Sequence, residues 1–532
     1  MRTWILLAAA VIAGGCATVR EPADLVLLGG RVFTNDPARP WAQGVAIRGE
    51  TVAAVGPTRE LRRYVGPGTR VVRLDGRLVV PGINDAHVHE PWGGDAAARL
   101  DVPNDATAAT LLQAIRDAAL ARPLGTWIVA TLPRSLIDAG FDRKTLDCVA
   151  PSHPVRLGTL GGHAALLNSK ALREWRIDEK AEDGWLYEHA VWLPQRREAE
   201  GKTDEELRAE IEAFAAEAAR FGITSVQTMS LVSPERVERL VAEVEPEIRW
   251  RVIEFRISGR VPPENEETRP IKYVLDGTPV ERNAALRAPY ADRKEWRGRL
   301  DYAPDDLREI IRRAATGERQ LLVHASGDAA VQTVLDLMKS AGITDWPARR
   351  VRIEHGDGIT DDLVDDVRAL GAVVVQNPAH FMNPELIAAR LGPERRRQWM
   401  KARSLLEAGI PFALGSDGPL NPWLNVMFAT MHPTNPPEAL TVEQGVRAYT
   451  RGSAFAEFEE HRKGTLAPGM LADLAVLSQD IFSVDVTELP KTTSEMTIVG
   501  GQVVWESLQN ETEARDVTAP ASRIQSGSPT PR

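Results

Sequence analysis

The residues best suited to chemistry in this 532-residue chain lie at positions 81–89. The segment reads Pro-Gly-Ile-Asn-Asp-Ala-His-Val-His and follows the strand-like run at 78–80. Side chains two positions apart on a strand point to the same face, so His87 and His89 can aim both imidazoles at one point. Imidazole pairs of this kind bind zinc and similar divalent ions. The alternative is a pair of strand-end histidines that binds no metal.

Further candidate metal ligands each follow an apolar, strand-like run. They are His324 after residues 321–323, His355 after residues 351–354, and Asp417 after residues 412–416. Active sites of barrels of parallel strands lie at the carboxyl ends of the strands, so this placement predicts a site at a barrel mouth. One such residue alone would more simply be a hydrogen-bonded strand end, but the repeated setting favours a metal site.

The elements that must position these residues alternate along the centre of the chain. Strand-like runs at 320–323, 351–353 and 372–375 are separated by amphipathic helical stretches, such as the one at 329–340. Regular alternation of strand and helix favours a parallel sheet of the α/β class. At this length it predicts a (β/α)8 TIM barrel, which we assign to residues 83–463.

Two other parts of the chain fall outside a minimal barrel. Short β-type runs with Gly and Pro turns at 24–82 and 464–505 predict one composite β-sandwich built from both ends of the chain. Residues from about 100 to 270 hold more material than the barrel needs and are expected to include an insertion over its mouth. Within them, the charged stretch at 203–220 predicts a helix with a solvated face.

The N-terminus has the pattern of an export signal. Arg2, the apolar run at 4–13 and two glycines precede Cys16. This pattern predicts a secretory signal peptide, and residues 1–16 resemble a bacterial lipoprotein signal whose cysteine becomes lipidated. The run is too short for an ordinary transmembrane helix, so membrane attachment would be by the lipid alone. We expect a lipid-anchored protein of the bacterial cell envelope that faces the periplasm, with ordinary secretion as the alternative.

The composition is that of an ordinary globular protein, with 43% hydrophobic and 26% charged residues. The net charge of -10 gives no support to nucleic-acid binding, which needs a basic face.

If Cys16 is lipidated, Cys148 has no partner for a disulfide and is expected to pack as a small apolar residue. The tail at 509–532, rich in Ser, Thr, Pro and Arg, is expected to be disordered. The oligomeric state is open, with a homodimer among the alternatives.

The ordered ligand set resembles the amidohydrolase superfamily, in which His-x-His, Lys, His, His and Asp occur in this order. The flanking residues resemble its YtcJ-like, amidohydrolase-3 branch. The matching segments are residues 81–89, 162–172, 221–227, 272–277, 323–330, 352–355 and 415–419. The resemblance runs from about residue 24 to residue 505. It implies the barrel, the β-sandwich and metal-dependent hydrolysis of a non-peptide C–N bond in a small amide, N-acyl or N-formyl substrate.

Lys272 occupies the lysine position of that pattern, inside the apolar run at 271–275. A lysine there is costly to bury unless it is paired or neutralised. In related enzymes such a lysine reacts with carbon dioxide to form a carbamate that bridges two metal ions, and this reaction needs the neutral amine that burial favours. The alternative is an unmodified Lys272 that binds substrate or pairs with Asp276 beside a single metal ion.

The ligand types predict a mechanism. His87 and His89 would hold one metal ion together with Asp417, while His324 and His355 would hold the second. Zinc is the default ion, with manganese, iron and cobalt as alternatives. A bound water would be acidified toward hydroxide. Asp417 would take its proton and pass it to the leaving amine as the general acid/base.

Two further histidines are candidates for substrate binding. His163 follows two glycines, and the resemblance puts its segment beside the active site, so we expect it to bind the substrate carbonyl as a catalytic residue. The alternative for His163 is a structural role in a loop. His380, in the run Asn-Pro-Ala-His, is a weaker candidate of the same kind.

Two other functions stay open. The same hydroxide attacks any activated carbonyl, so the chain could be an esterase, a lactonase or a cyclic imidase. It could also be a lipoprotein that binds a ligand without catalysis, although binding alone does not require an acid/base carboxylate such as Asp417. The segment at 131–134, Thr-Leu-Pro-Arg, departs from the Gly-rich, Trp-bearing segment frequent in the family, so the family's substrate specificity does not carry over.

Overall fold

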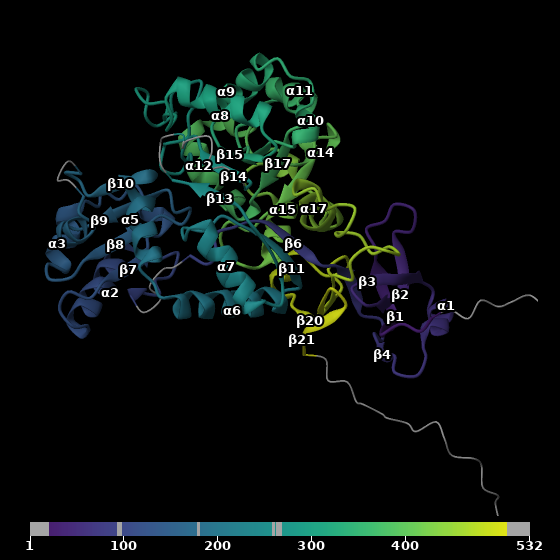
Figure 1. Cartoon of the computed structure of the whole chain (residues 1–532). Coiled ribbons are helices and arrows are strands. Elements are labelled where there is room, and N and C mark those ends of the chain that lie inside the picture. The colour runs from purple at the N-terminus through teal and green to yellow at the C-terminus, as the bar shows by residue number, and fades with distance from the viewer. Residues whose placement is uncertain (1–20, 93–97, 178–180, 258–260, 262–268, 508–532) are drawn as a thin grey trace, which may run out of the picture.

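The computed structural model of the chain describes residues 21–92, 98–177, 181–257, 261 and 269–507. Cys16 and the tail at 509–532 lie outside these residues, so lipidation, export and disorder of the tail stay predictions. Figure 1 shows a central body of strands and helices, with the strands of the N-terminal segment on one side and a smaller sheet on the other.

Both ends of the chain contribute to one eight-stranded sheet. Its strand order is β21-β20-β19-β5-β1-β2-β3, with β4 also paired to β1. The strands are β1 (Leu25–Phe33), β2 (Trp41–Arg48), β3 (Thr51–Gly56), β4 (Arg70–Arg73), β5 (Leu78–Pro81), β19 (Leu474–Leu477), β20 (Ser494–Val499) and β21 (Gln502–Glu506). The two ends meet where β5 runs antiparallel to β19, with Val80 opposite Ala475. This pairing defines a single mixed sheet, and the β-sandwich stays a prediction.

The centre of the chain forms two sheets in which all strands are parallel. The first has the order β12-β11-β6 and contains β6 (Ile83–Val88), β11 (Ile223–Thr228) and β12 (Arg249–Val252). The second has the order β13-β14-β15-β16-β17-β18 and contains β13 (Glu254–Arg256), β14 (Ile271–Val274), β15 (Leu321–Ala325), β16 (Arg352–His355), β17 (Val373–Gln376) and β18 (Phe412–Leu414). The mixed α/β class is therefore confirmed.

Helices follow most of these strands and pack their apolar faces on them. They include α6 (Asp204–Arg220), α7 (Pro234–Val244), α8 (Pro304–Thr316), α9 (Asp328–Ser340), α11 (Asp361–Ala369) and α15 (Pro422–Met431). Helix α9 confirms the prediction at 329–340, because its buried residues Val331, Val334, Leu335 and Met338 recur with helical spacing. The predicted charged helix is α6, whose N-terminus carries a capping box between Thr203 and Glu206.

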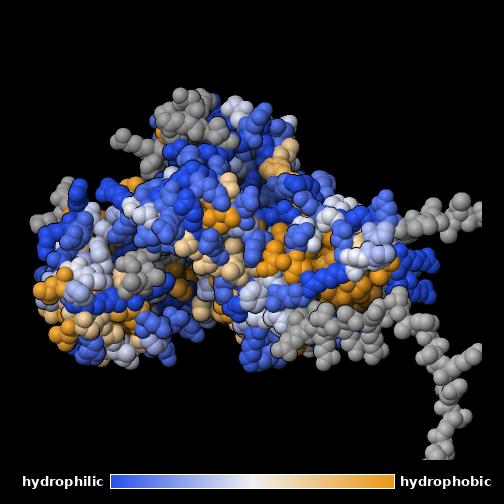
Figure 2. All heavy atoms as spheres, turned by 60° about the horizontal axis from the view of Figure 1, so that its bottom comes forward, coloured by the Kyte–Doolittle hydropathy of each residue, from blue (hydrophilic) through white to orange (hydrophobic). Residues whose placement is uncertain are grey.

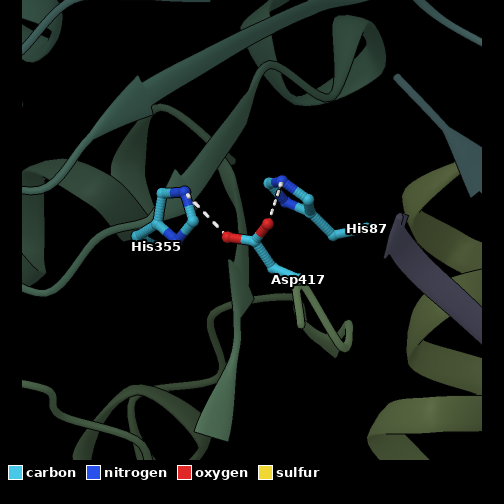
Figure 3. Close-up of side chains that lie close together, drawn as sticks. All are labelled: His87, His355 and Asp417. Atoms are coloured by element: carbon cyan, nitrogen blue, oxygen red, sulfur yellow. Dashed lines mark ion pairs between the residues drawn. The ribbon is translucent and has the colours of Figure 1, made fainter. Parts of the chain in front are cut away.

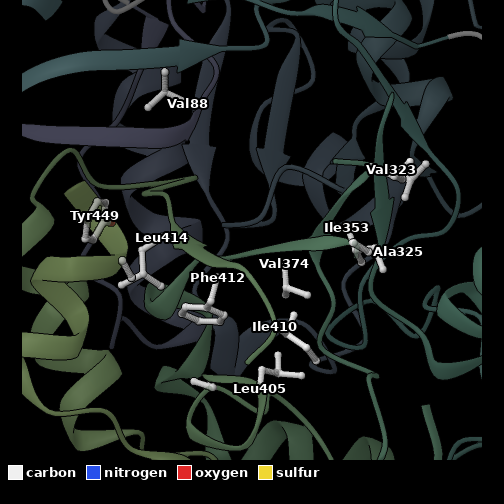
Figure 4. Close-up of a cluster of buried hydrophobic side chains, with 14 of the residues drawn as sticks. Val88, Val323, Ala325, Ile353, Val374, Leu405, Ile410, Phe412, Leu414 and Tyr449 are labelled. Carbon is white, nitrogen blue, oxygen red and sulfur yellow. The ribbon is translucent and has the colours of Figure 1, made fainter. Parts of the chain in front are cut away.

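Strands covered on both faces need apolar residues at successive positions. Strand β17 shows this, since all four of its residues are buried. Figure 4 shows the buried cluster that joins strands and helices, with Val323, Ile353, Val374 and Phe412 among its members. This core holds the carboxyl ends of the strands in place, where the predicted site residues lie.

A smaller four-stranded sheet lies between β6 and β11 in the sequence. Its order is β10-β9-β8-β7, and its strands are β7 (Ile128–Thr131), β8 (Val155–Gly158), β9 (Ala164–Leu167) and β10 (Trp185–Tyr187). It is accompanied by α2 (Ala108–Ala121), α3 (Arg143–Val149), α4 (Ser169–Glu174) and α5 (His189–Glu200). Cys148 on α3 is a free, exposed thiol, so the prediction that it packs as an apolar residue is wrong.

The described surface is mostly hydrophilic. On the face drawn in Figure 2, hydrophobic residues gather near its middle and at the end formed by the smaller sheet. Leu120 and Leu124 are among the exposed apolar side chains of that end. Within the described ranges, no helix is long and apolar enough to cross a membrane.

Candidate metal and active site

Three of the predicted ligands converge at the carboxyl ends of parallel strands. His87 is the penultimate residue of β6, His355 ends β16, and Asp417 follows β18 (Figure 3). One nitrogen of each imidazole and one carboxylate oxygen lie within 4.8 Å of one another. The Nε2 atoms of His87 and His355 lie 3.8 Å and 3.9 Å from the Asp417 oxygens. This group could hold a divalent cation.

The backbone is shaped to bring Asp417 onto the histidines. Its N–H donates a 2.9 Å hydrogen bond to the carbonyl oxygen of His87. Gly415 permits this approach, because a Cβ there would lie 2.5 Å from the Cβ of His87. Asp417 and His355 have φ values of 40° and 68°, a region that non-glycine residues enter rarely and mostly at functional sites.

Hydrogen bonds at Nδ1 hold the rings of the strand-end pair so that Nε2 of each faces the metal group. The Nδ1 atom of His87 lies 2.6 Å from Glu354 Oε2, and that of His89 lies 2.7 Å from the carbonyl oxygen of Met229. Such partners fix the tautomer of a metal-binding imidazole. The Nε2 of His89 then lies 3.3 Å from Asp417 Oδ1. His89 therefore adjoins the three-residue group.

The protonation states suit a metal site. Burial, followed by the charge of Lys272, lowers the pKa of His87 to about 4. Burial also lowers the pKa of His355 well below its ordinary value. Burial alone would raise the pKa of Asp417, but attraction to His87 and the hydrogen bond with His89 hold it well below its ordinary value. Neutral imidazoles and an ionised carboxylate are the forms that bind metals.

The ring of His355 provides an independent test of the fit. Both of its nitrogens are buried without a hydrogen-bond partner among the described residues. Buried polar atoms are nearly always paired, so unpaired ones call for a ligand. A divalent cation between His87, His355 and Asp417 would satisfy one of these nitrogens. The donor set therefore fits such an ion.

Lys272 points into the same group from β14. Its Nζ atom lies 2.8 Å from the Nε2 of His87, and burial lowers its pKa to about 8. Burial therefore increases the share of neutral amine near neutral pH, the form that carboxylation requires. The alternative pairing with Asp276 is not formed, because Asp276 accepts backbone N–H groups of Ala285, Ser326 and Gly327.

His324 and His380 flank the group on two sides. The ring centroid of His324 lies 4.4 Å from that of His355, and burial lowers its pKa well below the ordinary value. The ring of His380 stacks on His355, and its Nε2 lies 3.6 Å from Asp417 Oδ2. His324 thus lies beside His355, and His380 lies against the acid/base candidate.

His163 belongs to a buried pair that the sequence did not reveal. Its Nδ1 lies 2.7 Å from the Oε2 of Glu188, which is buried at the start of α5. Burial opposes protonation of His163, but the Glu188 carboxylate outweighs it and raises the pKa to about 9. The His163 ring centroid lies 4.7 Å from that of His324. His163 is therefore a cationic hydrogen-bond donor beside the metal group.

Glu354 is a second residue whose role the sequence did not reveal, although it stands beside His355. Burial alone would raise its pKa, but Arg352 and the hydrogen bond with His87 lower it to about 2.

We expect Glu354→Gln to weaken divalent-metal binding by about 10- to 100-fold, because the charge that orients His87 is lost. Competition with a chromogenic chelator would measure the affinity.

The control for this experiment is Glu407→Gln, a change of the same chemistry at an exposed residue. A thermal melt would show that both variants fold, since Glu354 also pairs with buried Arg352. Equal metal affinity in both folded variants would contradict a positioning role for Glu354.

A cavity of about 750 Å³ connects the metal group to the smaller sheet. Its walls include His89, Lys272, His324, His355 and Asp417 on one part, and His163 with Trp192 on another. Residues of β7 and β8 also line it. The cavity is large enough for a small-molecule substrate.

The chain is similar to known proteins over most of its length. A model of the amidohydrolase family matches residues 70–505. The chain is 27% identical over 539 residues to Protein LONG AFTER FAR-RED 3 of Arabidopsis thaliana, covering 91% of this chain and 92% of that protein. It is 25% identical over 537 residues to the N-substituted formamide deformylase of Arthrobacter pascens, covering 91% and 98%.

A putative amidohydrolase YtcJ of Bacillus subtilis is also similar, with 25% identity over 533 residues that cover 90% of this chain and 98% of that protein. Among solved structures, an uncharacterized metal-dependent hydrolase from Pyrococcus horikoshii superposes with a TM-score of 0.68 at 21% identity, covering 87% and 99% of the two chains. At this identity the structural likeness shows the fold alone.

Proposed function

Because this chain belongs to the amidohydrolase family, as its sequence predicts, we propose that it is a metal-dependent hydrolase of a non-peptide C–N bond. The substrate would be a small amide, N-acyl or N-formyl amine, a class to which the name of the Arthrobacter relative also points. The observation that carries the proposal is the convergence of His87, His355 and Asp417, with His89 and Lys272 beside them.

The donor set suits zinc in the first place, with manganese, iron and cobalt as alternatives. His87, His89 and Asp417 would hold one ion, and His324 and His355 would hold a second if Lys272 is carboxylated. Bound metal would supply Lewis acidity toward the substrate carbonyl and lower the pKa of a water.

The chain's own residues account for the proton transfers. Asp417 is ionised, so its carboxylate can accept a proton from the attacking water and give it to the leaving amine. Its two oxygens face His89 on one side and His380 on the other, so it is held in place throughout.

His163 would stabilise the charge that develops on the substrate oxygen. Its Nδ1–H is committed to Glu188, which leaves the other ring nitrogen to donate into the cavity. We expect His163→Gln to lower kcat/KM by about 10²- to 10³-fold with unchanged metal content, because a donor to the oxyanion is lost. The control is His461→Gln, whose side chain is 88% exposed. An unchanged kcat/KM would indicate that His163 has only a structural role in its loop.

Matched amides and esters test the proposed function. The metal-loaded protein would be assayed on N-formyl and N-acetyl amines and on esters of the same acyl and alkyl groups. We expect hydrolysis of at least one amide in preference to its ester. A reversed preference would favour the esterase, lactonase or imidase alternative. A metal-loaded protein inert toward the whole panel would favour a binding protein.

The finer architecture belongs to the same proposal. Only Ile253 separates β12 from β13, and Asp417 after β18 bonds to His87 on β6. The short link between β12 and β13 and the hydrogen bond between Asp417 and His87 support a barrel that closes through β6. The strands of the two chain ends would form an accessory β-structure. The proposal also includes a lipid anchor on Cys16, because residues 1–16 resemble a bacterial lipoprotein signal.

A further inference from the structure

Two arginines share one face of the smaller sheet and line the cavity. Arg99 forms a parallel bridge with Val129 on β7, and Val129 in turn pairs with Arg156 on β8. Residues paired in register across neighbouring strands direct their side chains to the same face. All three side chains line the cavity that contains the metal group. The arginines thus flank Val129 on the wall that the inserted sheet contributes.

Arg156 is a nearly buried cation, and one nitrogen of its guanidinium group lacks a hydrogen bond within the described part of the chain. Its side chain is 11% exposed, and its Nη1 atom is buried with no hydrogen-bond partner among the described residues. The nearest carboxylate, that of Glu198, lies 3.7 Å away and accepts a 2.6 Å hydrogen bond from the indole of Trp175. A buried cation needs a well-placed counter-charge, which Glu198 supplies only in part.

A second cation lies near Arg156. Arg99 repels Arg156, and its own contact with the Thr131 hydroxyl is long, at 3.5 Å. Burial lowers the pKa of Arg156, attraction to Glu198 opposes this, and the repulsion by Arg99 adds a smaller lowering. An anion between the two guanidinium groups would relieve both effects.

The acidic residues of the cavity do not fill this role. Glu210 forms an ion pair with Lys202. Glu90 accepts the backbone N–H of Trp92 at 2.8 Å, and burial raises its pKa, although Arg99 opposes the rise by a smaller amount. Within the described part of the cavity, the positive charge of the wall is therefore balanced only in part, and an anionic ligand would complete the balance.

We propose that Arg156 and Arg99 form an acid-binding subsite, so that the substrate is an N-acyl or N-formyl amine carrying a carboxylate remote from the scissile bond. The inference rests on the proposed function for the position of that bond. A planar guanidinium fork matches a carboxylate through paired hydrogen bonds, and the aromatic ring of Trp175 holds the Arg156 fork from one side. The cavity connects both ends of such a substrate.

Turnover by the metal-loaded protein gives the first test. The substrates are N-formyl-ω-amino acids with three to eight carbons, each compared with its methyl ester. We expect the acids to be preferred, and Arg156→Gln to lower kcat/KM for the best acid by about 10- to 100-fold while the methyl ester changes little. Arg156→Lys and Arg99→Gln should give smaller losses.

The control is Arg173→Gln, at an exposed arginine of α4. Equal use of acid and ester, or a loss by Arg156→Gln that is the same for both, would overturn the subsite and leave the hydrolase proposal standing.

Binding gives a second test that does not depend on hydrolysis. α,ω-Dicarboxylates from succinate to suberate would be titrated into the same preparation, with the fluorescence of Trp92 and Trp192 in the cavity as the signal. Saturable binding that Arg156→Gln weakens at least 10-fold and Arg173→Gln leaves unchanged supports the subsite, even if no amide is hydrolysed. No saturable binding, or equal binding by both variants, overturns it.

Discussion

Asp417→Asn is expected to lower kcat by about 10²- to 10⁴-fold, the usual contribution of a general acid/base. Asparagine has the same shape and keeps one of the two oxygens that face the histidines, but its amide cannot accept the proton of the attacking water. The substitution is also mild for the backbone, because asparagine tolerates the positive φ of 40° at this position. The backbone hydrogen bond to His87 is unaffected.

Steady-state kinetics on the best amide of the panel would measure the loss, with circular dichroism and metal content recorded on the same samples. Asp365→Asn is a suitable control, since the Asp365 side chain is 84% exposed. A folded, metal-loaded Asp417→Asn protein with near-normal activity would remove Asp417 from the acid/base role.

Lys272→Ala is expected to reduce the metal content from about two ions per chain to about one, and to lower kcat by at least about 10²-fold as transition-state charge loses its stabilisation. Alanine cannot form the carbamate that would bridge the ions. A short carboxylic acid such as propionate could enter the vacated space, so we expect it to restore part of the activity. The fold should survive, because a buried lysine costs free energy rather than stabilising the strand.

Elemental mass spectrometry on protein produced with added metal and bicarbonate would count the ions. Lys294→Ala, at an exposed lysine, controls for loss of a charge. About one ion in the unaltered protein, with no rescue of the variant, would indicate an unmodified Lys272 in a mononuclear site. An unaltered protein without bound metal would undercut the hydrolase proposal itself.

The sequence alone determined the elements and the metal-binding character of the site. The apolar run of β17 and the helical spacing of apolar residues in α9 are visible in the sequence of each segment alone, without knowledge of its neighbours in the fold. The candidate ligands could be proposed because several of them lie at or just past the end of such a run, as His355 ends β16. The order of these ligands also carried the family resemblance, which the family match confirms.

Only the tertiary structure decided which side chains control the ligands. His87 and Glu354 are 267 residues apart in sequence, and no local pattern marks them as partners. Lys272 and Asp276 are close in sequence, yet the first faces His87 while the second is held by backbone N–H groups past the strand end. Arg99 and Arg156 share a wall only because β7 lies between them. Such pairings depend on strand register and on the packing of distant segments, because a charge or hydrogen bond acts through space rather than along the chain.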